Sequence, residues 1–460
     1  MVLTMLQLPH EMLVLVFLYL DARTLARLAT TCSDMLYRRT LPLTPVEDAL
    51  RQRMTACGRV SPLRLPVSFS SWSVYLAWLE QRRDEARRCV AAAVHSSVFL
   101  SEHGRILHCG RVLSQDMPYG VDVEYDIHQA ELLSTMTQVD VVGIASGGCG
   151  FTAAVSSTGE VYTWGSCFYG TLGHGHPTTA LPRRVCALSA HRVLSVAAGY
   201  QHCLAVCESG RVFSWGWNYH GQCGHGLFNH DQLQPRLIEA LSGIWVRSGS
   251  AGDNHSVVVS EAGALYSFGG GIHGQLGHGC DSCLNSPVQV DALQHVRVTY
   301  ASAGFYYSLA VGEDGSVFAW GNNGEGQLGH GLCGTRELVP RQVEALRGIH
   351  VHSVTTGVGF SGAVTRAGDV YTWGDGQDGQ LGLGDMESRP MPSRVDALRY
   401  QHVLEVSAGV THMIAFTRSG AVFGWGSRIS LGVVMTDEST PDIVPSPRRL
   451  GTHVGVCGRH

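Results

Sequence analysis

One five-residue motif recurs along this chain at a nearly constant spacing. Val-Tyr-Thr-Trp-Gly occupies residues 161–165, and five variants of it follow. A weaker copy lies at 106–110, with Cys109 55 residues before the first aromatic residue of the series. A period this regular means that one supersecondary unit repeats seven times and buries its apolar face against its neighbours. The aromatic residues before the last Gly, in steps of 51, 53, 52, 53 and 52 residues, are Trp164, Trp215, Phe268, Trp320, Trp373 and Trp425.

The third repeat shows what one unit contains. Four short runs of β-branched, aromatic or other apolar residues are separated by Gly, Pro and Ser. These runs occupy residues 193–199, 202–206, 211–215 and 235–241. Such runs indicate four antiparallel strands, and no helical periodicity occurs between 90 and 450. We therefore predict a mainly β fold, a seven-bladed β-propeller, because propellers are rings of about four to eight four-stranded sheets.

Two further motifs accompany several of the copies. Ala-Gly-x-x-His occurs at 198–202, 251–255 and 408–412, and Gly-Gln-Leu-Gly-His-Gly occurs at 274–279 and 326–331. Together with the Trp-Gly motif, they resemble the repeat of the regulator of chromosome condensation family. The motifs of Trp-Asp and kelch propellers do not recur. The resemblance implies a seven-bladed propeller over residues 90–460.

The first 89 residues have a different composition, with little Gly and much Leu, Met and Arg. Pro9 suits the first turn of a helix, and Asp21 can cap a second helix with an apolar face. The segment contains Leu-Pro-x-Glu at 8–11, an apolar run at 16–20 before Asp21, and a second apolar stretch at 25–32. With these motifs it resembles an F-box, which implies a small all-α module over 1–45 that binds a Skp-type adaptor. The residues that would contact the adaptor are Leu8, Pro9, Leu13, Val16, Phe17, Leu20, Leu25, Leu28 and Cys32.

Two other interpretations of the N-terminal segment are a signal peptide and a helical cap. Residues 12–20 could form the core of a signal peptide, but no Lys or Arg precedes them and no clean cleavage site follows. They are also far short of the roughly twenty residues needed to span a bilayer. A plain helical cap for the propeller is the second alternative. Residues 46–89 contain an amphipathic pattern followed by a charged run, and we expect a helical linker there.

Composition limits the possible functions. The net charge of −5 gives no electrostatic basis for binding nucleic acid. The 14 Cys have no disulfide spacing, which favours reduced thiols in the nucleus or cytoplasm. Cys280 and Cys283 form a lone Cys-x-x-Cys pair, and a zinc site would need a second pair of ligands.

The recurring loop histidines are expected to be structural. No catalytic constellation stands out, so we expect no enzyme activity, cofactor or metal. The loop histidines are His174, His225, His278 and His330.

All 33 basic residues are Arg, and the chain has no Lys. Codon usage is the simpler interpretation of this bias. A functional interpretation is that a ubiquitin-ligase subunit without Lys is protected from modifying itself. The sequence leaves both open.

The F-box resemblance implies docking onto a Skp–cullin–RING ubiquitin ligase, with the propeller as receptor for a protein substrate. The first alternative is guanine-nucleotide exchange on a small GTPase, the activity of the repeat family's founding member. The constant repeat spacing leaves no room for the inserted hairpin linked to that activity. A non-ligase scaffold is the second alternative. Light sensing, as in plant ultraviolet-B photoreceptors, is disfavoured because the Trp positions are held by Tyr200, Asp253, Phe305, Val358 and Val410.

Strand order predicts which side of the propeller binds substrate. Antiparallel strands place the first turn and the third loop of every blade on one side. Aromatic residues and an acidic sector gather in these connections, so we predict a substrate segment with an apolar anchor and Arg or Lys. The predicted substrate-binding residues are Phe168, Tyr169, Tyr200, Trp217, Tyr219, His220, Phe305, Tyr306, Glu325, Asp375 and Asp378, with His273 and Tyr307 on the same side.

Overall fold

A computed structural model describes residues 88–93, 96–100, 105–114, 123–132, 136, 138–175, 179–431 and 443–450. The chain separates into two compact units, 1–87 and 88–460. The first unit lies outside the described residues, and so do the predicted adaptor-binding face and nearly all of the helical linker. No helix in the described part combines the length and apolar character needed to cross a membrane.

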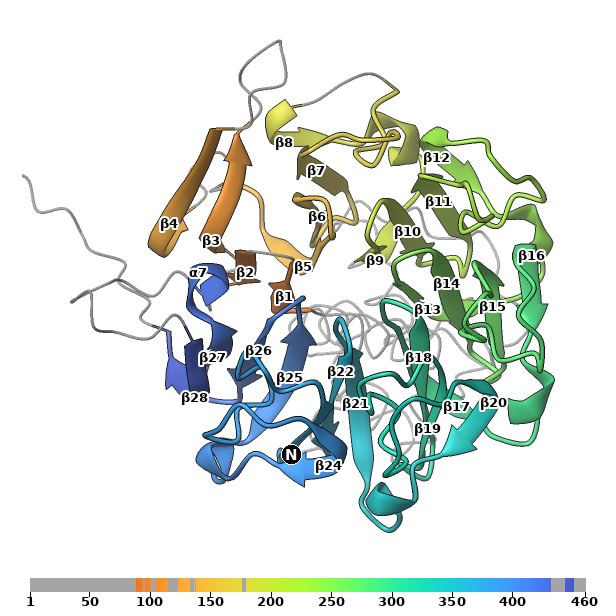
Figure 1. Ribbon diagram of the computed structural model, residues 1–460. Coiled ribbons are helices and arrows are strands. Elements are labelled where there is room, and N and C mark those ends of the chain that lie inside the picture. The colour runs from red at the N-terminus through yellow and green to blue at the C-terminus, as the bar shows by residue number, and fades with distance from the viewer. Residues whose placement is uncertain are drawn as a thin grey trace, which may run out of the picture. The chain divides into compact units, whose positions relative to one another are not determined.

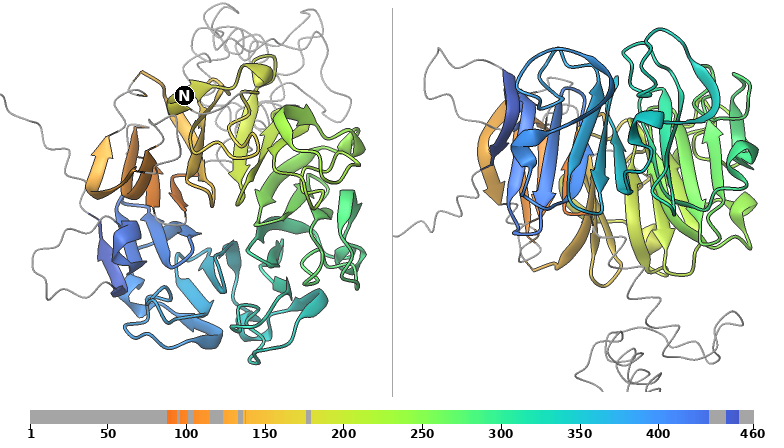
Figure 2. Two further views of the ribbon diagram at one scale, coloured as in Figure 1. Left: turned by 45° about the horizontal axis from the view of Figure 1, so that its top comes forward. Right: turned by 90° about the horizontal axis from the view of Figure 1, so that it is seen from below.

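Seven four-stranded antiparallel sheets form a ring in the described part of the second unit (Figure 1). Each sheet is one blade, made of four consecutive strands, and the view from the side shows the strands running between the two faces of the ring (Figure 2). This confirms the predicted mainly β, seven-bladed propeller.

The strands of blades 1 to 4 are β1 Val90–Ala92, β2 Ser96–Leu100, β3 Ile106–Ser114, β4 Val123–Leu132, β5 Val141–Ser146, β6 Phe151–Ser156, β7 Val161–Gly165, β8 Thr179–Arg184, β9 Val193–Ala198, β10 His202–Cys207, β11 Val212–Gly216, β12 Gln232–Leu237, β13 Val246–Ala251, β14 His255–Ser260, β15 Leu265–Gly269 and β16 Leu284–Gln289. Those of blades 5 to 7 are β17 Val298–Ala303, β18 Tyr307–Gly312, β19 Val317–Gly321, β20 Glu337–Gln342, β21 Val351–Thr356, β22 Phe360–Thr365, β23 Val370–Gly374, β24 Arg389–Arg394, β25 Val403–Ala408, β26 His412–Thr417, β27 Val422–Ser427 and β28 Ile443–Arg449.

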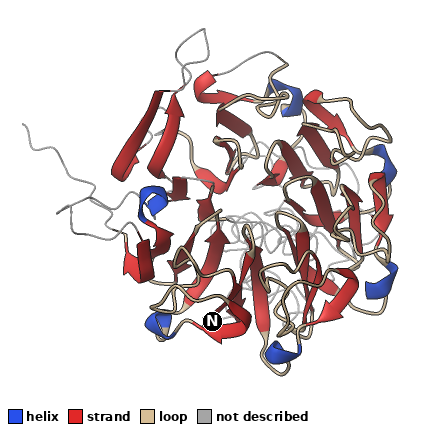
Figure 3. Ribbon diagram, in the orientation of Figure 1, coloured by secondary structure: helices blue, strands red, loops and turns tan. Residues whose placement is uncertain are grey.

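Short helices follow the fourth strand of several blades (Figure 3). In blade 3 the predicted strand at 235–241 is only partly correct, because β12 ends at Leu237 and Glu239–Leu241 forms a 3₁₀ turn. Leu241 is nevertheless buried, which explains why its apolar side chain resembled part of a strand. The α-helical turn found among the described residues, α7 Arg428–Leu431, is too short to show helical periodicity. The 3₁₀ turns are η2 Cys186–Leu188, η3 Glu239–Leu241, η4 Asp291–Leu293, η5 Glu344–Leu346 and η6 Asp396–Leu398.

The repeated Trp residues pack between blades. Trp215 is fully buried in a cluster that also contains Phe151 and Leu172 of blade 2. Its indole Nε1 donates a hydrogen bond of 2.8 Å to the carbonyl oxygen of Thr171. The indole of Trp320 makes the equivalent bond of 2.9 Å to the loop of the preceding blade. One Trp per period therefore joins each of these blades to its predecessor, which accounts for the constant spacing of the motif.

Glycine permits close contact between the inner turns of neighbouring blades. A Cβ atom on Gly199 would lie 2.3 Å from the carbonyl oxygen of Gly252 in the next blade. The adjacent residue, Tyr200, donates its backbone N–H to that same oxygen at 3.0 Å. A side chain at this Gly would separate the two turns, so the Ala-Gly motif has a structural cause.

Buried histidines connect blades through serine. His202 Nε2 lies 2.8 Å from Ser256 Oγ in the next blade, and Ser256 donates its own hydroxyl to the carbonyl of Gln222 at 2.8 Å. Because that hydroxyl hydrogen is used, Nε2 must carry the hydrogen of the imidazole. His255 and Ser308 repeat this arrangement at 2.8 Å one blade further on. In these blades the His of the motif therefore forms a polar link inside an apolar core.

Two blades replace this polar link with an apolar one. Phe151 and Phe360 occupy the positions equivalent to His202, at the first residue of the second strand. Phe151 packs in one buried cluster with Cys203, and Phe360 packs in another with Met413. In these blades, a Phe at this position therefore packs on an apolar residue of the following blade, whereas a His bonds to a Ser there.

A cavity of about 190 Å³ is lined by the first strands of all seven blades. Near the start of the described chain, Arg88 Nε lies 3.8 Å from Glu405 Oε1 of blade 7, and its guanidinium carbon lies 5.1 Å from the Tyr300 ring centroid. The Cys89 N–H donates to the other Glu405 oxygen at 2.8 Å. Burial raises the pKa of Glu405 to about 7, although Arg88 and the backbone N–H groups oppose the shift. These contacts join the beginning of blade 1 to blade 7.

Candidate protein-binding face

Strand direction defines two faces of the propeller. Because each sheet contains four consecutive antiparallel strands, the turns after first strands and the loops after third strands lie on the same face. We call it the first face. The turns between second and third strands and the connections to the next blade lie on the opposite face. Every predicted substrate-binding residue belongs to a connection on the first face.

Four residues of blades 2 and 3 form the outer aromatic cluster: Tyr169, Trp217, Tyr219 and His220. The Trp217 ring stacks on Tyr219 with centroids 6.0 Å apart and an interplanar angle of 14°. Tyr169 of the neighbouring loop lies 6.0 Å from Trp217. His220 meets both blade 3 rings edge-on, at 5.4 and 5.0 Å. Tyr219 is 57% exposed, so the cluster offers ring surface to a partner.

The loops that carry this cluster have fixed conformations. Asn218 is fully buried; its amide donates to the carbonyl of Leu227 at 3.1 Å, and its oxygen accepts the Cys223 N–H at 2.9 Å. Asn323 makes the corresponding bonds in blade 5. Phe168, 47% exposed, lies beside Tyr169 in the blade 2 loop. Sequence reasoning missed both asparagines, although each stands two residues after a Trp-Gly pair.

A second group on the same face forms the inner cluster: Tyr200, Asp253, His273, Phe305 and Tyr306. The Tyr306 ring lies 4.3 Å from Phe305 and 4.4 Å from His273, measured between centroids. The Tyr306 hydroxyl donates a hydrogen bond to the carboxylate of Asp253. Burial raises the pKa of Asp253 to about 6, and the hydrogen bond from Tyr306 opposes the rise. Asp253 was not among the predicted site residues, although it occupies the same turn position as Tyr200.

The predicted acidic sector consists of Glu325, Asp375 and Asp378. A Cβ atom built on Gly359 would lie 3.2 Å from Glu325 Cγ and 3.6 Å from Asp375 Cβ, so these two side chains meet at that glycine. Burial, and then the charge of Asp375, raises the pKa of Asp378. The structure therefore brings the three acids together.

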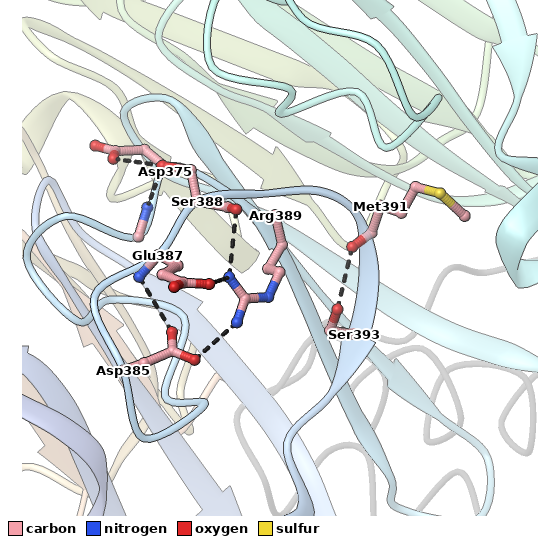
Figure 4. Close-up of polar contacts among 8 residues, drawn as sticks. Asp375, Asp385, Glu387, Ser388, Arg389, Met391 and Ser393 are labelled. Carbon is pink, nitrogen blue, oxygen red and sulfur yellow. Dashed lines mark hydrogen bonds and ion pairs between the residues drawn. The ribbon is translucent and has the colours of Figure 1, made fainter.

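Some polar groups near the acidic sector have a structural role (Figure 4). Asp375 accepts hydrogen bonds from Gln380 Nε2 at 3.0 Å and from Ser388 Oγ at 3.4 Å. Arg389 does not neutralise this sector, because it pairs with Asp385 at 2.7 Å and Glu387 at 2.9 Å. Asp375 thus helps to hold its own loop.

One residue expected on this face lies in the core. Tyr307 is fully buried, and its hydroxyl donates to the carbonyl oxygen of Phe360 in the next blade. Tyr307 occupies the position at which three other blades have the buried His of the Ala-Gly-x-x-His motif. That position in the motif therefore indicates a buried residue. The prediction that Tyr307 stands on the surface was wrong.

Three of the four recurring loop histidines, His174, His225 and His278, lie within hydrogen-bond distance of hydroxyl groups of their own blades. His225 Nε2 lies 2.9 Å from Ser214 Oγ, and His278 Nε2 lies 2.9 Å from Ser267 Oγ. Burial lowers the pKa of His225 to about 4. Over the ranges that the structure describes, no group of three or more His, Cys, Asp or Glu side chains could hold a metal ion.

Family models account for both parts of the chain. The model of the RCC1-like domain matches residues 79–361. The chain belongs to the RCC1-like domain family. A model of the regulator of chromosome condensation (RCC1) repeat also matches 367–416, and an F-box-like model matches 5–35. These matches confirm the combination of an N-terminal F-box with a repeat propeller.

Two curated relatives of the RCC1-like propeller are similar over about two thirds of this chain. The ultraviolet-B receptor UVR8 of Arabidopsis thaliana is 35% identical over 285 residues, 62% of this chain and 64% of UVR8. The E3 ubiquitin-protein ligase HERC2 of Homo sapiens is 37% identical over 300 residues, 64% of this chain and 6% of HERC2. The chain thus spans less than two thirds of either relative.

Solved structures share the RCC1-like fold. Human WBSCR16 superposes with a TM-score of 0.65 and 24% identity, covering 75% of this chain and 94% of that one. Prp20p from Saccharomyces cerevisiae superposes with a TM-score of 0.66 and 19% identity, covering 78% of this chain and 88% of Prp20p. At these identities the likeness shows the fold alone.

Proposed function

We propose that this chain is the substrate-recognition subunit of a Skp–cullin–F-box ubiquitin ligase. The observation that carries the proposal is the F-box-like match at 5–35 joined to an RCC1-like propeller. An F-box implies a Skp-type adaptor, and the propeller supplies a large surface for a second protein. The chain itself would be non-catalytic, with ubiquitin transferred by other subunits.

The first face is proposed as the substrate-binding surface. It carries exposed rings of the outer aromatic cluster next to connections that contain the inner cluster and the acidic sector. Buried aromatic anchors with a polar rim are typical of protein interfaces. Rigid loops also reduce the entropy lost on binding, and the buried Asn218 provides such rigidity. We expect the substrate segment to combine an apolar anchor with Arg or Lys.

The substrate face is tested by replacing two rings of the outer aromatic cluster. Trp217→Ala with Tyr219→Ala should lose the substrates that co-purify with the full chain, while adaptor binding is retained. The matched control is Glu313→Ala with Arg297→Ala, which removes an exposed ion pair on the opposite face. Loss of substrates only in the control variant would contradict the assignment of the first face.

A further inference from the structure

The carboxylate of Asp253 stands between two tyrosines on the first face. Asp253 donates its backbone N–H to the carbonyl of Gly304 in blade 5 at 3.2 Å, so its turn is attached to the turn that carries Tyr306. On the other side, the backbone of Tyr200 in blade 3 is bonded to Gly252, the neighbour of Asp253. Three consecutive blades therefore hold these residues at the inner rim.

The two tyrosines differ in how they use their hydroxyl groups. The Tyr306 hydroxyl donates to Asp253, whereas the Tyr200 hydroxyl bonds to the Cys149 side chain. A Cβ atom on Gly148 would lie 2.1 Å from the Tyr200 ring, which means that this ring packs on the glycine. Tyr200 is thus held in place while 39% of it remains exposed. Its ring can contact a ligand without releasing an internal bond to Asp253.

Asp253 has unused capacity to accept hydrogen bonds. Its carboxylate is half-buried, and within the described ranges no Arg or His forms an ion pair with it. Tyr306 provides a single donor, whereas a carboxylate can accept about four hydrogen bonds. With a pKa of about 6, the group is mostly ionised at neutral pH. A partly desolvated negative charge with one neutral donor favours a cationic ligand.

We infer that Asp253, with the rings of Tyr200 and Tyr306, binds an arginine side chain of the substrate segment. A guanidinium is planar, donates several hydrogen bonds to a carboxylate and stacks on aromatic faces. Lysine would bring charge but neither the fork of donors nor the flat surface. This inference rests on the proposed function of the first face, and it names the side chain that the inner cluster recognises.

The test uses the full chain and two synthetic peptide libraries. One library has a fixed central arginine among varied residues, and the other has citrulline in its place, which is nearly isosteric but neutral. The wild-type chain should retain arginine peptides at least about tenfold better than citrulline peptides. Asp253→Asn should abolish this preference, and Tyr306→Phe should weaken it. Glu313→Gln, an equal change of charge on the opposite face, should leave it intact.

The outcomes separate this inference from the proposal on which it rests. If Asp253→Asn keeps the arginine preference while the Trp217 and Tyr219 double variant loses the peptides, the first face stands and the arginine site is wrong. If both variants bind the peptides like the wild type, the first face itself is wrong. Equal retention of arginine and citrulline peptides by the wild type would also overturn the inference. Circular dichroism of Asp253→Asn should match the wild type, because the exchange preserves shape.

Discussion

Buried side chains in this propeller form matched pairs across blade boundaries. Where the second strand begins with His202, the next blade supplies the hydroxyl of Ser256, and where it begins with Phe151, the next blade supplies Cys203. Each member of a polar pair is fully buried, so its partner cannot be replaced by water without moving the blades. The core therefore depends on compatible pairs of residues.

Ser256→Ala should lower the free energy of unfolding by about 1–3 kcal/mol. The change leaves the His202 Nε2–H and the Gln222 carbonyl without their common partner in a buried site. His202→Phe with Ser256→Cys copies the natural Phe151–Cys203 pair and should restore part of this loss. Denaturant unfolding measures both. A double variant less stable than Ser256→Ala would contradict the pairing.

Buried histidines should make the propeller sensitive to acid. Burial lowers the pKa of His202 and of His255 to about 3, below the value of about 6.5 expected in the unfolded chain. Between these values the unfolded state binds protons that the folded state does not, so stability falls as pH falls below 6.5. Each histidine should lower the free energy of unfolding by about 2 kcal/mol when the pH falls from 6.5 to 5.

The contribution of one histidine can be isolated by comparing two proteins. The His202→Phe, Ser256→Cys variant should lose about 2 kcal/mol less than the wild type over that pH interval. Asp253 and Glu405, whose raised pKa values act in the opposite direction, are present in both proteins and cancel. Identical pH profiles in urea titrations would show that His202 does not titrate as the structure requires.

At the scale of elements, the loops of the first face are held by buried side chains. Asn218→Ala should remove two hydrogen bonds from the blade 3 loop and leave a buried N–H and a carbonyl unsatisfied. Amide hydrogens at 217–231 should exchange about tenfold faster or more, as measured by mass spectrometry. Asn323→Ala is the matched control, because it should loosen the blade 5 loop alone. Unchanged exchange at 217–231 would contradict this role.

The sequence predicted the elements well where its periodicity was strong. The Trp-Gly motif located the third strands of blades 2 to 7, because its aromatic residue is buried in a hydrophobic cluster in each of these copies. The sequence misplaced two residues, because their side chains are buried for reasons that the repeat pattern does not reveal. Leu241 is buried on a 3₁₀ turn, and Tyr307 is a core residue with a polar end. Asp253 was missed because contacts between turns of different blades cannot be read from one repeat.

At the scale of the whole molecule, the absence of Lys affects the proposed ligase role. All 33 basic residues are Arg, so the chain offers no lysine side chain to ubiquitin. Arg366 and Arg418 are exposed on turns of the opposite face. Arg366→Lys and Arg418→Lys preserve charge, and we expect them to shorten the half-life of the protein in cells with active ligase. Half-lives unaffected by these substitutions, measured by pulse-chase, would leave codon usage as the explanation.

The central claim is that the F-box joins this propeller to the ligase and that the propeller brings the substrate. The most direct measurement is adaptor-dependent co-purification of the full chain and of a Leu8→Ala, Pro9→Ala variant, read by quantitative mass spectrometry. The variant should lose the Skp-type adaptor and the cullin together, since truncation of central apolar anchors costs about 2 kcal/mol or more each. It should keep the substrates and an unchanged melting temperature of the propeller. Equal recovery of adaptor and cullin with both proteins would contradict the account.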